Sequence, residues 1–102
     1  WNPVRSYKEE VLDKLDAMKE DFDIFQYGSL SHDPERYPLF SAKTKNWSEG
    51  KPYVLITGGV HGYETSGVQG AILFLQTAAV KYSAHYNILV CPCVSPWGYE
   101  CI

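Results

Sequence analysis

The chain has 102 residues, of which 45% are hydrophobic and 21% charged, with a formal net charge of −3. This size and composition are typical of one modest globular core and argue against a disordered chain. The nine Lys and Arg residues form no basic run, and the longest apolar run, residues 71–75, is far too short to cross a bilayer, so we expect neither a nucleic-acid nor a membrane partner.

The first predicted element is a helix over roughly residues 2–21. Asn2 is a suitable N-cap, Pro3 suits the first helical position, and acidic residues follow early in the sequence. Apolar residues then recur at spacings of four and three, which gives the helix one face to pack against a sheet: Tyr7, Val11, Leu15, Met18 and Phe22.

Two short segments rich in aromatic and β-favouring residues come next, at 23–30 and 38–44. The Ser, Asp and Pro residues between them are turn formers, so we predict a hairpin at the edge of a sheet.

A strand, a helix and a second strand follow. Residues 52–59 and 86–94 are nearly continuous in apolar residues, as expected of strands covered on both faces. Between them, from Glu64 to about Tyr82, apolar residues recur with a helical period: Val68, Ile72, Leu75 and Ala79. This order predicts a βαβ unit with parallel strands, and hence an α/β fold with a mixed sheet around a βαβ core.

The three cysteines, Cys91, Cys93 and Cys101, are odd in number, and the first two alternate along a predicted strand. The spacing C-P-C is not that of a zinc knuckle. We therefore predict free thiols, a reducing compartment and a cytoplasmic location.

A candidate metal site lies where the first parallel strand ends. The segment "ITGGVHGYETSG" places His61 and Glu64 three residues apart at the start of the next helix, with glycines that let the backbone turn. Ligands of open α/β sheets bind beyond the carboxyl ends of the strands, and an imidazole with a carboxylate can hold zinc. The alternative is structural: Glu64 as an early-helix acid, and His61 as a loop residue bonded to backbone.

The segment "GGVHGYETSGVQGA" resembles the zinc-site signature of the M14 metallocarboxypeptidase superfamily, and "SPWGYE", residues 95–100, is similar to a second motif of that family. The resemblance covers roughly residue 52 to the end of the chain. Three positions depart from the family pattern. Tyr63 stands where the digestive members have Arg, and Ser95 and Trp97 replace Asn and Asp.

The resemblance implies a zinc-carboxypeptidase-like (phosphorylase/hydrolase-like) fold, with residues 1–102 forming the N-terminal portion of a single catalytic domain. It implies a zinc ion held by His61, Glu64 and a later His, and hydrolysis of an amide next to a carboxylate. The general base and the arginines are expected beyond Ile102. By this reading, His32 in a turn and His85 ahead of a strand lie at the wrong places to close the zinc site, His85 is a surface loop residue, and residues 1–102 alone are not the working enzyme.

Three functions remain open. The first is a metallocarboxypeptidase acting on a peptide. The second is a deacylase acting on an N-acyl amino acid, because the form H-G-x-E with Gly62 also resembles the aspartoacylase and succinylglutamate desuccinylase branch. The third is a metal-free α/β binding module in which His61 and Glu64 only shape a loop.

Overall fold

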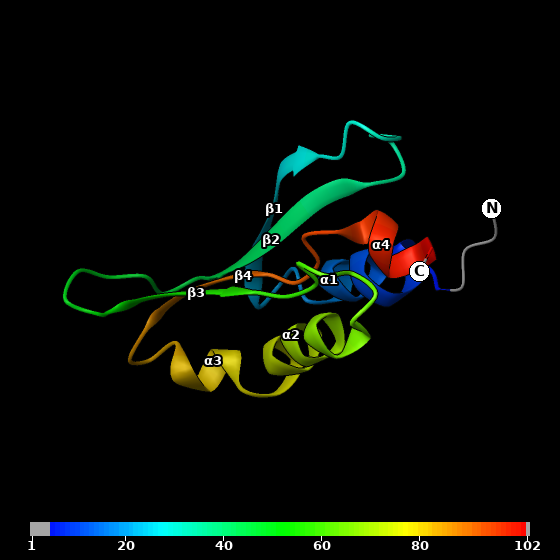
Figure 1. Ribbon diagram of the computed structural model, residues 1–102. Coiled ribbons are helices and arrows are strands. Elements are labelled where there is room, and N and C mark those ends of the chain that lie inside the picture. Colours follow the sequence, from blue (N-terminus) through cyan, green and yellow to red (C-terminus); the bar gives the residue numbers. More distant parts are fainter. Residues whose placement is uncertain (1–4, 102) are drawn as a thin grey trace.

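The computed structural model describes residues 5–101 and contains a four-stranded mixed sheet in the order β1-β2-β4-β3 (Figure 1). The strands are β1 (Phe22–Ser29), β2 (Pro38–Thr44), β3 (Tyr53–Thr57) and β4 (Asn87–Cys91). β2 pairs antiparallel with β1 and with β4, whereas β3 and β4 are parallel. The predicted α/β fold, edge hairpin and parallel pair are all confirmed.

The N-terminal helix is shorter than predicted. It comprises a π-helical turn η1 (Lys8–Leu12) and α1 (Asp13–Ala17), while the predicted cap at Asn2 and Pro3 lies outside the described residues. Ser6 takes a capping role: its Oγ accepts a hydrogen bond from Glu9 N at 3.1 Å, and its own N–H donates to the Glu10 carboxylate at 2.9 Å.

The predicted apolar face of this helix is buried at all five positions. Phe22, however, belongs to β1 and not to the helix. Its burial follows from the sheet, because Phe22 pairs with Thr44 of β2 and packs in the same core as Val11 and Leu15.

The second predicted helix is divided into α2 (Thr65–Thr77) and α3 (Ala79–Tyr82). Ala78 lies between them with φ −123°, and the Thr77 hydroxyl donates to the Leu73 carbonyl at 2.7 Å, a local bond that competes with regular helix. A further short helix, α4 (Pro96–Cys101), begins at a proline, which suits a first helical position. Over residues 5–101, no helix has the length and apolar character to span a bilayer.

The core lies on one face of the sheet. Residues of all four strands and of α1 and α2 meet there, and Figure 1 shows α2 and α3 on the same side of β3 and β4. The prediction that β3 is covered on both faces is wrong within the described chain, because Tyr53 and Leu55 are 72% and 65% exposed. The physical reason is that α2 packs against the opposite face, that of Val54 and Ile56, and no described helix covers the face of Tyr53 and Leu55.

Candidate metal site

The candidate site is the loop that connects β3 to α2. Gly58 N–H donates to the Cys91 carbonyl at 2.9 Å and so extends the parallel pairing by one bond. The chain then turns at Gly59, whose φ of +65° is strained for any residue with a side chain. The turn directs residues 60–64 away from the sheet, beyond the carboxyl ends of β3 and β4, where open α/β sheets bind their ligands.

His61 and Glu64 are brought together by this loop. His61 Nδ1 lies 3.2 Å from Glu64 Oε1, and the two side chains are 64% and 62% exposed. The Glu64 N–H donates to the His61 carbonyl at 2.9 Å, which fixes the turn between them. The pairing predicted from the H-x-x-E spacing is therefore present, and both groups are open to solvent.

The Glu64 carboxylate is not used as a helix cap. Glu64 is the N-cap residue of α2, yet its side chain makes no capping hydrogen bond. The positive end of the α2 dipole still favours a negative charge at this position. A carboxylate held at a helix N-terminus and turned toward an imidazole is available to a cation.

The spacing of the pair fits a shared zinc ion. Two ligand atoms of a tetrahedral zinc site, each about 2.0–2.2 Å from the metal, lie roughly 3.3–3.6 Å apart. The observed separation of 3.2 Å is close to this value, and it also permits a hydrogen bond when Nδ1 carries a proton. Within residues 5–101 no third His, Cys, Asp or Glu joins the pair. A catalytic zinc requires three protein ligands, and this pair offers two candidates for them.

The segment after β4 supports the loop from behind. Ser95 Oγ donates to the Val60 carbonyl at 2.8 Å, and Ser95 N–H donates to the Gly59 carbonyl at 2.9 Å. A Cβ on Gly62 would collide with backbone atoms of Ser95 and Tyr99, so only glycine fits here without displacement of α4. Sequence reasoning placed "SPWGYE" near the site but did not foresee that it forms this support.

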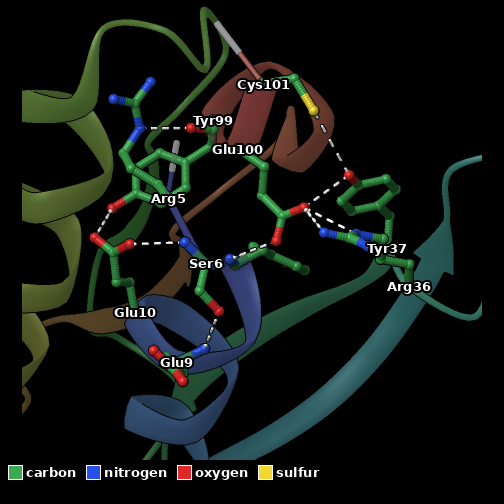
Figure 2. A network of polar contacts seen from close by, with 10 residues as sticks. Arg5, Ser6, Glu9, Glu10, Arg36, Tyr37, Tyr99, Glu100 and Cys101 are labelled. Atoms are coloured by element: carbon green, nitrogen blue, oxygen red, sulfur yellow. Dashed lines mark hydrogen bonds and ion pairs between the residues drawn. The ribbon is translucent and has the colours of Figure 1, made fainter. Parts of the chain in front are cut away.

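Glu100 anchors α4 to the rest of the fold (Figure 2). Its side chain is 5% exposed, and its carboxylate accepts hydrogen bonds from Tyr7 N–H and from the Tyr37 hydroxyl, each at 2.8 Å. Arg36 Nη2 forms an ion pair with the same carboxylate at 2.8 Å. Burial, followed by the hydrogen bond to Glu100, raises the pKa of Tyr37 above its ordinary value. This cluster joins α4, the N-terminal helix and the hairpin turn.

A second group of polar contacts ties α4 to α2 and the N-terminal helix. The Tyr99 hydroxyl donates to Glu10 Oε1 and accepts from Gln69 Nε2, each at 2.8 Å. Burial, then the hydrogen bond to Glu10, raises the pKa of Tyr99 to about 12. Desolvation raises the pKa of Glu10, but bonds from Ser6 N–H, Tyr99 and Gln69 outweigh it, so that pKa lies below its ordinary value. Neither cluster was predicted, because their members are far apart in sequence.

Two cavities flank His61. One, of about 320 Å³, is formed by the glycine turn and the start of α2 and includes Glu64. The other, of about 330 Å³, lies on the opposite side and is bordered by Tyr63 and Trp97. A larger groove of about 820 Å³ runs between the N-terminal helix and the hairpin, but it contains neither member of the pair. We therefore place the candidate site at His61.

Within residues 5–101, none of the remaining predicted residues forms a metal-binding group with the pair. His32 and His85 are both exposed, which confirms the prediction of a surface position for His85. Cys93 is buried, and burial raises the pKa of its thiol to about 12, so it is no readily ionised ligand at neutral pH. That all three cysteines are free thiols stays a prediction.

No protein-family model and no curated protein sequence matches the chain, whereas several solved structures do. A predicted metallopeptidase of Shewanella amazonensis matches with a TM-score of 0.72 and 24% identity, over 91% of this chain and 33% of that one. Another from Shewanella baltica gives 0.71 and 23%, over 88% and 34%. A chain in the structure of bovine thrombin-activatable fibrinolysis inhibitor in complex with tick carboxypeptidase inhibitor gives 0.65 and 21%, over 91% and 30%.

These matches confirm the metallocarboxypeptidase-like fold that the two motifs predicted. At such identities the likeness shows the fold alone. The chain spans about a third of the length of the solved structures that it matches.

Proposed function

We propose that this chain is the N-terminal portion of the catalytic domain of a zinc-dependent hydrolase that cleaves an amide bond next to a carboxylate, as a metallocarboxypeptidase does. One observation carries the proposal. In a metallopeptidase-like fold, His61 and Glu64 lie 3.2 Å apart at the carboxyl end of a parallel strand, exposed and spaced as two ligands of one ion.

The two residues have different tasks in this proposal. His61 supplies a neutral nitrogen ligand, and Glu64 supplies a negative charge that offsets part of the charge of the dication. Zinc, when bound, polarises the substrate carbonyl and lowers the pKa of a water molecule toward neutrality. We expect the third ligand, the general base and the oxyanion donors in the part of the fold beyond this chain.

The deacylase alternative loses its main support in the structure. Gly62 suggested that branch because of the form H-G-x-E, but packing against α4 already requires glycine at this position. Gly62 is therefore compatible with either substrate, a peptide or an N-acyl amino acid. Comparing the release of an amino acid from a blocked dipeptide with its release from an N-acyl amino acid separates the two enzymes.

The test of the proposal is the zinc content of the complete protein that carries this chain. We expect one zinc per molecule, and we expect His61→Ala to lose most of it together with hydrolysis, because three protein ligands are already the minimum for a catalytic site. His85→Ala, at an exposed loop histidine, is the matched control and should keep both. Full zinc occupancy in His61→Ala, or no zinc in the wild type, would overturn the proposal; the latter would favour the binding module.

A further inference from the structure

Three consecutive carbonyl groups of the loop between β3 and α2 are held by two residues that follow β4. The Gly58 carbonyl accepts from Val94 N–H at 3.0 Å, and the Gly59 carbonyl accepts from Ser95 N–H at 2.9 Å. The Val60 carbonyl accepts from the Ser95 hydroxyl at 2.8 Å. The first two bonds come from the backbone, so any residue except proline could supply them. Only the third bond depends on the side chain at position 95.

This third bond lies directly before His61, and a second anchor lies directly after it. Gly62 packs so closely on the start of α4 that a Cβ there would lie 2.3 Å from the Ser95 carbonyl oxygen. The backbone of His61 is thus held on both sides by the segment 95–99. The bond from Glu64 N–H to the His61 carbonyl, at 2.9 Å, then places Glu64 relative to His61.

The segment that provides both anchors is itself fixed in the core. Tyr99 and Glu100 are buried, and Tyr99 N–H donates to the Ser95 carbonyl at 3.0 Å. The Glu100 carboxylate accepts from Tyr7 N–H, and Figure 2 shows its contact with the Tyr37 hydroxyl. Because these contacts are internal to the described chain, they do not depend on what covers its outer surface.

Ser95 directly precedes Pro96, the first residue of α4, and a serine at such a position ordinarily caps the helix with its oxygen. The contact with Val60 uses the other capability of the hydroxyl, because it donates the hydrogen. Alanine at position 95 would lose both capabilities, and threonine would keep both. Ionised aspartate would keep a capping acceptor but has no hydrogen to donate. These substitutions separate capping from donation by experiment.

We infer that Ser95 is a positioning residue of the candidate metal site. With Gly62 seated on α4, its hydroxyl fixes the backbone on both sides of His61. The pair of His61 and Glu64 is thereby kept at the spacing of two ligands of one ion, and ligands that are ordered in advance bind more tightly. This role rests on the proposed function and adds a residue to it. Because the sequence departs from the family pattern at Ser95, the resemblance itself assigns that residue no role.

The first test measures the zinc affinity of the complete protein by competition with a chromophoric chelator. Ser95→Ala should weaken zinc binding by about tenfold, the lower end of the range for residues that orient metal ligands. Ser95→Thr, which keeps the hydroxyl, should stay close to wild type. Thr77→Ala is the matched control, because it removes an exposed hydroxyl that donates to the Leu73 carbonyl at 2.7 Å at the far end of α2. It should leave zinc affinity unchanged.

The second test is amide hydrogen exchange in the zinc-free complete protein and requires neither metal nor activity. Ser95→Ala and Ser95→Asp should each speed exchange of the Glu64 amide by about 2- to 10-fold, the equivalent of one ordinary hydrogen bond. The Ile72 amide inside α2 and the urea denaturation midpoint should stay unchanged. Ser95→Thr and Thr77→Ala should leave the Glu64 amide as in wild type.

Two outcomes of the exchange experiment would overturn the inference. Equal acceleration at Glu64 and Ile72 would mean that Ser95 only stabilises the fold, and restoration by Ser95→Asp would mean that it acts only as a helix cap. Wild-type zinc affinity in Ser95→Ala would overturn it as well. If the wild-type protein binds no zinc, the proposed function fails, and the exchange measurement alone then decides whether Ser95 positions the loop.

Discussion

Replacement of Glu100 by Gln tests whether the polar cluster in Figure 2 stabilises the fold. Gln has nearly the same shape as Glu, but its amide has one acceptor oxygen and an NH₂ donor. In the wild type, Oε2 accepts from Tyr7 N–H, and Oε1 accepts from the Tyr37 hydroxyl and Arg36. When the NH₂ group takes the place of Oε2, it faces the Tyr7 N–H, a buried donor that is left without a partner. When it takes the place of Oε1, the Tyr37 hydroxyl can turn to accept from it, but the ion pair with Arg36 is lost.

The magnitude follows from burial. Glu100 is 5% exposed in its side chain, and Tyr7 and Tyr37 are 2% and 1% exposed, so water cannot replace the lost acceptor. A buried unsatisfied group costs about 1–3 kcal/mol, and bonds to a charged group lie at the upper end of that range. We therefore expect Glu100→Gln to lower the free energy of unfolding of the complete protein by about 2–3 kcal/mol in urea denaturation.

The control for this substitution is Glu20→Gln, at an exposed residue, which should stay within about 0.5 kcal/mol of wild type. A Glu100→Gln protein as stable as that control would refute the reasoning, since it would mean that the carboxylate contributes no more than a neutral amide. A change in the denaturant dependence, without a change in midpoint, would instead point to the unfolded state.

Three further predictions follow from the site. Glu64→Gln should lower zinc affinity and kcat/KM together, each by more than the roughly tenfold loss caused by mutating residues that only hydrogen-bond to a metal ligand. A variant that binds zinc tightly but has lost turnover would identify Glu64 as the general base instead. Gly62→Ala should lower the free energy of unfolding by about 1–2 kcal/mol because its Cβ meets the backbone of α4, whereas Gly70→Ala, in open space on α2, should raise it slightly; equal effects would contradict this packing. Burial raises the pKa of Tyr99 and that of Cys93 to about 12. The stability that each protonated group contributes is therefore fully present below its unfolded pKa and is lost as the pH rises toward 12. The denaturation midpoint should fall from about pH 9 upward, and a midpoint that stays constant to about pH 11 would contradict this prediction.

Much of the fold was accessible from the sequence because its elements are defined by local periodicity. The apolar residues of the N-terminal helix and α2 repeat with a helical period, those of β4 form a nearly continuous run, and the structure buries most of them. The errors have tertiary causes. Phe22 matches the helical spacing but belongs to β1, where it pairs with Thr44. The outer face of β3 is exposed because no described helix packs on it.

The candidate site likewise has a part that local sequence reveals and a part that it does not. His61 and Glu64 are three residues apart, so their spacing reveals them, but the residues that hold their loop lie 35 positions away at Ser95 and, through Tyr7 and Glu100, 93 positions apart. No local pattern encodes such contacts. Gly62 shows the consequence most clearly: in the sequence it favours one branch of a family, whereas in the structure it is required by the backbone of α4. Because packing fixes Gly62, the residue carries no information about substrate.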